Sequence, residues 1–222
     1  MEETLQKMDA FFNPHSVAVI GATKKADKAG HVIFKNFATN KQHGVFKGEL
    51  YPVNPNEDSI LGFKCYHSLS QIPGKIELIV VIVPAKFVPS IMDEAAAKKV
   101  KTAIIISSGF KEVGNKELED QVVAAAAKGG IRVLGPNCLG VYYSKTGIDT
   151  LFLPETKILT TGEEVVATPR PMPGNIAMIT QSGAFGVAAL DYLTGRQIGV
   201  SKFVSFGNKC DVTESDILHY LL

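Results

Sequence analysis

The sequence predicts a doubly wound α/β fold built on a parallel sheet. In the stretch Ser16–Gly30, the short apolar run 17–20 ends at Gly21, and a helical pattern begins after Gly30. A strand, a glycine turn and a helix in this order form the phosphate-binding corner of dinucleotide-type folds. A second observation is the nearly unbroken apolar run 76–83, which is typical of a central strand buried on both faces. Apolar runs and helical patterns then alternate along most of the chain.

The elements of a first domain follow one another over residues 1–145. We expect strands at 17–20, 48–55, 76–83, 103–106 and 131–134, and helices near 5–12, 30–37, 89–100 and 117–128. Asn13-Pro14 ends the first helix, and Gly129-Gly130 ends the last one. Such an order predicts a doubly wound α/β domain.

The composition changes after this domain. Residues 146–173 are rich in proline and show little periodicity, which favours a linker or an insertion. From residue 174 the α/β pattern resumes, with strands at 176–180 and 203–206 and helices at 184–193 and from 215 on. Because two such units bury their own faces poorly, we expect the region 174–222 to be an incomplete domain of a longer protein.

Charge and cysteine usage exclude several classes of partner. The 222 residues include 23 basic and 22 acidic side chains, a net charge of +1, which argues against nucleic-acid and membrane partners. Cys65, Cys138 and Cys210 are scattered and odd in number, so we expect neither disulfides nor a zinc site. The histidines show no metal-ligand spacing. With no signal peptide or membrane span in the sequence, a cytoplasmic location is expected.

The candidate site lies at the carboxyl ends of the predicted strands, where open parallel sheets bind ligands. These ends are Gly21-Ala22-Thr23, Val53-Asn54-Pro55, Val83-Pro84-Ala85, Ser107-Ser108-Gly109 and Gly135-Pro136-Asn137. None of them carries the acidic residue that holds the ribose in NAD sites. The first loop instead offers Lys24, Lys25 and Lys28, which suit a ligand with several phosphates.

A second anion site is indicated at Ser182. This residue lacks the first glycine of a G-x-S-x-G nucleophile motif, and no G-x-x-x-x-G-K-[ST] phosphate loop occurs in the chain. We expect Ser182 to cap the helix that begins near Ala184, where free N–H groups would face an anion. Each of these features also has an explanation without a ligand. The serine cap and the glycine turns can be purely structural, the lysines can be solvated surface charges, and the prolines can simply end strands.

Motifs in order along almost the whole chain resemble the N-terminal part of the NDP-forming (ADP-forming) acyl-CoA synthetases. This acetate–CoA ligase family is related to the succinyl-CoA synthetase α subunit. The motifs are Phe12-Asn13-Pro14, Ser16–Thr23, Tyr51–Pro55, Val83-Pro84-Ala85, Ser107–Glu112, Leu134–Gly140, Thr150-Leu151-Phe152, Pro173–Ala177, Gln181–Gly186 and Ser205–Lys209.

The resemblance implies a Rossmann-like CoA-binding domain, followed by the first half of a flavodoxin-like domain. The family interconverts acyl-CoA, ADP and phosphate with acid, CoA and ATP through an acyl phosphate and a phosphohistidine. ATP, ADP and Mg²⁺ would bind in an ATP-grasp domain, either fused or on a β subunit. The residues implied to line the CoA site are Gly21, Ala22, Thr23, Lys24, Asn54, Pro84, Ser108, Gly109 and Asn137. Ser182 and Gly183 would face the phosphohistidine.

The departures from the family pattern limit these expectations. The phosphohistidine loop would lie beyond Leu222, and His219 sits in an ordinary helical pattern, so we expect CoA binding without turnover and no catalytic residue in this chain. The segment 156–171 is longer than the family's linker and has no assigned role. Apolar edges in the region 174–222 predict an oligomer. The alternatives are a CoA-sensing module without ligase chemistry and an NAD(P)-dependent oxidoreductase.

Overall fold

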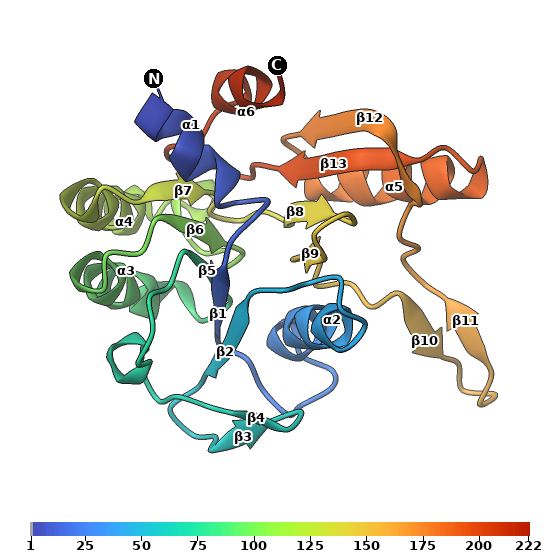
Figure 1. Ribbon diagram of the computed structural model, residues 1–222, viewed down its shortest axis with the longest axis horizontal. Coiled ribbons are helices and arrows are strands. Elements are labelled where there is room, and N and C mark those ends of the chain that lie inside the picture. The colour runs from blue at the N-terminus through green and yellow to red at the C-terminus, as the bar shows by residue number, and fades with distance from the viewer. Residues whose placement is uncertain (1) are drawn as a thin grey trace.

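The computed structural model describes residues 2–222, with side chains from Gln6 onward, and its centre is a five-stranded parallel sheet (Figure 1). The strands are β1 (Ser16–Ile20), β2 (Glu49–Val53), β5 (Leu78–Val81), β6 (Thr102–Ile105) and β7 (Arg132–Leu134). They lie in the order β2-β1-β5-β6-β7, and each neighbouring pair is parallel. The predicted doubly wound α/β fold is confirmed.

Helices cover both faces of this sheet because successive strand residues point to opposite sides. The helices are α1 (Glu2–Asp9), α2 (Ala29–Gln42), α3 (Val88–Ala97) and α4 (Lys116–Gly129). Val17 and Val19 of β1 pack into one buried cluster with the phenylalanines of α2. Ala18 and Ile20 belong to the cluster on the other face, with α3 and α4 (Figure 1). A small hairpin of β3 (Ser59–Ile60) and β4 (Phe63–Lys64) follows β2.

A second sheet has four strands in the order β12-β13-β8-β9. They are β8 (Gly140–Tyr143), β9 (Ile148–Asp149), β12 (Pro173–Thr180) and β13 (Val200–Ser205). The strands β12 and β13 are parallel and are joined by α5 (Gly183–Gly195), whereas β8 pairs with β13 in antiparallel orientation. The chain that directly follows β7 therefore enters the second sheet, and the predicted division at residue 145 stays a prediction.

The segment 146–173 contains more regular structure than its sequence suggests. Besides β9, it forms a hairpin of β10 (Thr156–Ile158) and β11 (Glu164–Val166), which projects from the rest of the molecule (Figure 1). Ile158 and Val166 are exposed on it. Because these strands are only three residues long and bury almost nothing, they carry no apolar alternation that could reveal them.

The last helix, α6 (Glu214–Leu221), packs beside α1 at the edge of the first sheet (Figure 1). The Tyr220 ring stacks on Phe12 with a centroid distance of 4.9 Å, and its hydroxyl donates to Asp9 Oδ1 at 2.8 Å. The two ends of the described chain therefore lie side by side. Across residues 2–222, no helix combines the length and the apolar character needed to cross a membrane.

Candidate functional site

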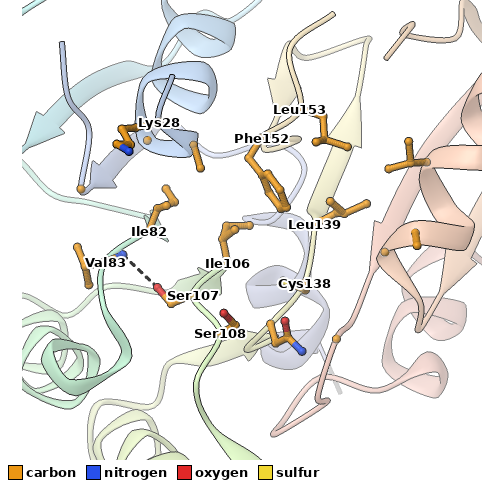
Figure 2. Close-up of a pocket in the computed structure, with 18 of the residues that line it drawn as sticks. Lys28, Ile82, Val83, Ile106, Ser107, Ser108, Cys138, Leu139, Phe152 and Leu153 are labelled. Carbon is orange, nitrogen blue, oxygen red and sulfur yellow. Dashed lines mark hydrogen bonds between the residues drawn. The ribbon is translucent and has the colours of Figure 1, made fainter. Parts of the chain in front are cut away.

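A cleft of about 990 Å³ lies between the carboxyl ends of β1, β5, β6 and β7 and the start of α5 (Figure 2). The first sheet contributes strand-end loops, and the second sheet contributes the first turn of its helix. The lining residues from the loops that follow these strands and from the start of α2 are Gly21, Thr23, Lys28, Ala29, Gly30, Ile82, Val83, Pro84, Ile106, Ser107, Ser108, Asn137, Cys138 and Leu139. Those from the rest of the chain are Phe152, Leu153, Gln181, Ser182, Gly183, Ala184, Val187 and Gly207.

The first loop of the cleft is built by backbone contacts that require glycine. Gly21 has φ +94°, and a Cβ there would lie 2.1 Å from the carbonyl oxygen of Ile82. A Cβ at Gly30 would lie 2.0 Å from the carbonyl oxygen of Gly21. The start of α2 is thereby pressed against the ends of β1 and β5. Because this helix start has neither a side-chain cap nor an acidic residue in its first turn, its N–H groups suit an anion.

The lysines of the first loop have different surroundings. Lys28 lines the cleft, and it is the one charged side chain among the described residues that do so. The Lys24 ammonium lies 3.0 Å from Glu57 Oε2, and neither residue belongs to the described lining. Lys28 is 61% exposed and pairs with Asp27 at 3.0 Å, so its head can reorient toward a ligand. The structure thus places Lys28, rather than the predicted Lys24, at the cleft.

The predicted site residues fall into two groups. Gly21, Thr23, Pro84, Ser108 and Asn137 line the cleft, together with Ser182 and Gly183. The other four, Ala22, Lys24, Asn54 and Gly109, are absent from its described lining.

Residues of the second group support the loops from behind. Asn54 Nδ2 donates to the carbonyl oxygen of Ala22 at 2.7 Å and so braces the first loop. The Gly109 N–H donates to Glu112 Oε1 at 2.5 Å, which leaves that N–H engaged within its own loop. Whether any of the predicted residues contacts CoA stays a prediction.

Asn208 joins the loop after β13 to the loop after β6. Its Nδ2 donates to Glu112 Oε2 at 2.6 Å and to Glu119 Oε2 at 2.9 Å. Burial alone would raise the pKa of Glu112, but hydrogen bonds from Asn208 and Gly109 hold that pKa below its ordinary 4.5. Gly207 presses against Asn137, because a Cβ there would lie 2.1 Å from the Asn137 carbonyl oxygen. These contacts join the loop after β13, in the second sheet, to the loops that follow β6 and β7 in the first sheet.

The start of α5 forms the opposite end of the cleft. Ser182 is its N-cap, and Ser182 Oγ accepts a hydrogen bond from the Phe185 N–H at 3.3 Å. The predicted capping role of Ser182 is therefore confirmed. No acidic residue occupies the first turn, so this helix start also suits an anion.

The apolar wall near α5 was not predicted from the sequence. Leu139, Phe152, Leu153 and Val187 line the cleft there, with Phe152 and Leu153 coming from the segment after β9. Of these four residues the motif Thr150-Leu151-Phe152 contains only Phe152, and its lack of periodicity conceals which side chain faces the cleft. Cys138 also lines the cleft, and burial raises the pKa of its thiol to about 12. At neutral pH this thiol is protonated and is a poor nucleophile.

The cleft offers anion-binding helix starts and apolar surface rather than metal ligands. Over the described part of the chain, no group of three or more His, Cys, Asp and Glu side chains could hold a metal ion. The geometry suits an elongated molecule with a phosphate-bearing end and a flexible, partly apolar arm.

Comparisons with known proteins define the class that this fold and site represent. Residues 15–144 match the family model described as a CoA binding domain. Residues 173–222 match the model of a succinyl-CoA ligase like flavodoxin domain. The cleft therefore lies between a CoA-binding domain and a succinyl-CoA ligase-like one.

Similar proteins narrow the class further. The chain is 42% identical, over 96% of its length, to acetate–CoA ligase [ADP-forming] I subunit alpha of Pyrococcus furiosus, and covers 44% of that protein. It is 41% identical, over 94% of its length, to acetate–CoA ligase [ADP-forming] of Methanocaldococcus jannaschii, and covers 27% of it.

A solved structure agrees with these relatives. Acetyl-coenzyme A synthetase 1 of Ca. Korarchaeum cryptofilum, in complex with phosphate and ADP, is 38% identical with a TM-score of 0.85; the match covers 96% of this chain and 42% of that one. The chain belongs to the CoA binding domain family. It resembles the CoA-binding part of ADP-forming acetate–CoA ligases. It spans less than half the length of these relatives.

Proposed function

We propose that this chain binds CoA along the cleft between β1, β5, β6 and β7 and the start of α5. The diphosphate lies at the start of α2 beside Lys28, and the pantetheine arm crosses the surface of Ile82, Val83 and Ile106. The thiol points toward Ser182 and Gly183. The predicted contacts of Gly21, Thr23, Pro84, Ser108 and Asn137 follow from this path.

One observation carries the proposal: a single cleft joins two helix starts, and an apolar floor lies between them. Each start lacks an acidic residue in its first turn, and Lys28 adds the one cationic side chain of the described lining. A diphosphate needs N–H donors and a cation, whereas the pantetheine arm needs an extended surface of mixed polarity. A volume of about 990 Å³ suits a ligand larger than a nucleotide's phosphate group.

The whole enzyme would interconvert acyl-CoA, ADP and phosphate with acid, CoA and ATP through an acyl phosphate. The match to the Pyrococcus furiosus α subunit and to a structure holding phosphate and ADP supports this. The phosphohistidine, the ATP-grasp domain or subunit, and its nucleotide and Mg²⁺ would lie outside residues 1–222. This chain's own residues would orient the thiol, exclude water with the apolar wall, and present the Ser182–Gly183 turn to the phosphoryl group. In this proposal residues 1–145 form the CoA-binding domain, residues 146–173 a linker or insertion, and residues 174–222 the first half of a flavodoxin-like domain.

Isothermal titration calorimetry of the 222-residue chain with CoA and with NADH tests the proposal. We expect saturable CoA binding that weakens as salt increases, because the phosphates meet a lysine and helix N–H groups. We expect no saturable binding of NADH, since the residue directly after β2 is Asn54 rather than the acid that holds the ribose in NAD sites. Saturable NADH binding, or the absence of CoA binding, would contradict the proposal.

A further inference from the structure

The cleft has a distinct apolar end beside α5. Phe152, Leu153 and Leu139 lie together on that side, whereas Lys28, Ile82 and Val83 lie across the cleft from them (Figure 2). Phe152 also packs against the buried cluster that contains Leu139 and Leu190. Within the described lining, this end presents no cationic side chain. A group bound here meets carbon atoms and the first turn of α5.

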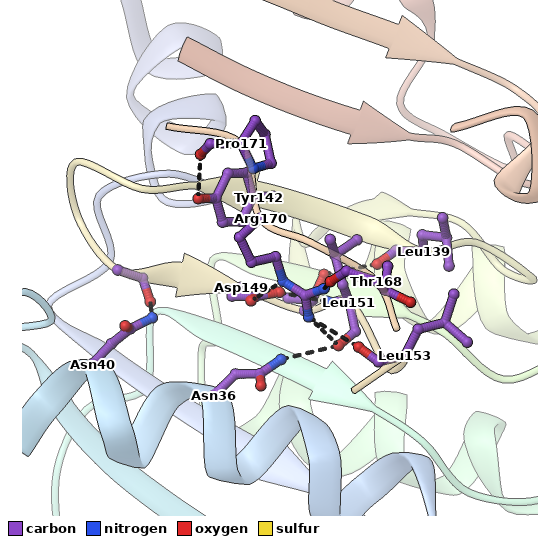
Figure 3. Close-up of polar contacts among 12 residues, drawn as sticks. Asn36, Asn40, Leu139, Tyr142, Asp149, Leu151, Leu153, Thr168, Arg170 and Pro171 are labelled. Atoms are coloured by element: carbon purple, nitrogen blue, oxygen red, sulfur yellow. Dashed lines mark hydrogen bonds and ion pairs between the residues drawn. The ribbon is translucent and has the colours of Figure 1, made fainter. Parts of the chain in front are cut away.

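The backbone that carries Phe152 and Leu153 is held by a side chain rather than by a sheet. Arg170 Nη2 donates to the carbonyl oxygens of Leu151 at 3.4 Å and Leu153 at 3.0 Å (Figure 3). Its Nη1 donates to the carbonyl oxygen of Thr168 at 2.8 Å. Arg170 therefore joins the two sides of the segment 149–170 at the base of the projecting hairpin.

Asp149 fixes the guanidinium and the same backbone. Its Oδ2 accepts from Arg170 Nε at 2.7 Å, and its Oδ1 accepts from the Leu151 N–H at 2.9 Å. The Arg170 and Asp149 side chains are 9% and 7% exposed. Asn36 of α2 donates to the Leu151 carbonyl oxygen at 3.0 Å, which ties the segment to the first sheet's helix (Figure 3).

The donors of Arg170 are thus engaged by the Asp149 carboxylate and by backbone carbonyl groups, and Arg170 is not among the described lining residues of the cleft. A second carboxylate on an acyl group would find no cation at the apolar end within the described lining. Burying such a charge without a partner is strongly unfavourable. The apolar end therefore suits a short, uncharged acyl chain.

We propose that Phe152 and Leu153, the two residues of the apolar wall that follow β9, limit the length of the acyl group on a bound acyl-CoA. Arg170 and Asp149 are positioning residues that keep this wall in place. The inference rests on the proposed CoA binding, which places the thiol, and hence a thioester, at the start of α5.

Calorimetry with CoA, acetyl-CoA and hexanoyl-CoA tests the wall, because these ligands differ only beyond the sulfur atom. We expect hexanoyl-CoA to bind about tenfold more weakly than acetyl-CoA, since the longer chain would meet the Phe152 and Leu153 side chains. In Phe152→Ala the ratio of the two Kd values is expected to fall to about twofold, because the truncated side chain leaves a cavity for the longer chain. Phe87→Ala, at a half-exposed phenylalanine outside the described lining of the cleft, is the matched control and is expected to keep the wild-type ratio.

The paired variant Asp149→Asn/Arg170→Gln tests the positioning role without leaving one buried charge alone. If losing this ion pair lets Phe152 and Leu153 move, the ratio of the Kd values of hexanoyl-CoA and acetyl-CoA is expected to fall, as it does in Phe152→Ala. A merely structural role would weaken all three ligands by one factor and leave the ratio unchanged, which would overturn the positioning role.

The outcomes separate this inference from the proposed function. Failure of CoA itself to bind the wild-type chain would contradict both. Normal CoA binding with equal affinities for acetyl-CoA and hexanoyl-CoA, or with a ratio that Phe152→Ala leaves unchanged, would overturn the wall alone. The Phe152→Ala result stands even if the paired variant does not fold.

Discussion

Lys24 and Lys28 lie four residues apart in one loop, and their side chains have different surroundings. The Lys24 ammonium pairs with Glu57, whereas Lys28 lines the cleft at the start of α2. The lysines of this loop predict a phosphate ligand from the sequence, but which lysine faces the cleft depends on the direction of each side chain. That direction is set by the helix start and by Glu57, which lies beyond the second strand. Tertiary contacts of this kind leave no local signal in the sequence.

At the residue scale, we expect Lys28→Ala to weaken CoA binding about fivefold and to reduce its salt dependence. Lys24→Ala in the same loop is the matched control, with an expected change below about twofold because its charge is already paired with Glu57. Calorimetry at low and high salt measures both variants. Equal losses in the two variants, or a larger loss in Lys24→Ala, would exclude Lys28 as the phosphate partner.

At the scale of elements, α6 is attached to the first sheet by charged groups. Asp216 Oδ2 accepts from the Thr213 N–H at 2.8 Å, and Asp216 Oδ1 lies 3.2 Å from Arg132 Nη2 on β7. Arg132 Nε also donates to Asp211 Oδ2 at 2.9 Å. Burial alone would raise the pKa of Asp216, but the bonds from Thr213 and Arg132 hold it below the ordinary 3.8.

The lowered pKa of Asp216 predicts how the attachment of α6 depends on pH. A carboxylate with a lowered pKa contributes stability that is present above its ordinary value and is lost as pH falls through the folded-state value. We therefore expect Asp216→Asn to lower the free energy of unfolding by about 1 kcal/mol at pH 7. This difference from the wild type should shrink as pH falls below 3.8 and disappear once the folded-state carboxyl is protonated.

Urea unfolding at neutral and acidic pH measures this difference. Asp191→Asn, at an exposed position on α5, serves as the control, since its difference from the wild type should stay near zero throughout. A deficit in Asp216→Asn that persists undiminished in acid would contradict the role assigned to the carboxylate.

At the scale of the whole molecule, the alternation of strands and helices is sufficient to predict the first sheet and the edge at which its ligand site lies. Parallel strands connected by helices bring their carboxyl ends to one edge, so the order of elements along the chain already groups Gly21, Pro84, Ser108 and Asn137. The capping role of Ser182 was predictable too, because a cap residue and a helical pattern follow each other in sequence.

The wall and its support could not be predicted in this way. Phe152 and Leu153 follow a two-residue strand, and the partners Asp149 and Arg170 are separated by a projecting hairpin. Such a segment has no period that fixes which side chains face inward. The pairing of β8 with β13 depends likewise on contacts between distant parts of the chain. These non-local contacts join the two sheets and shape the cleft.

A crystal structure of the 222-residue chain with bound CoA would show directly whether CoA lies in this cleft and in which direction. We expect the diphosphate at Lys28 and the start of α2, the pantetheine arm over Val83 and Ile106, and the thiol at Ser182 and Gly183. CoA bound in a different cleft, or bound with its thiol at Lys28 and its diphosphate at α5, would rule out the proposed CoA site.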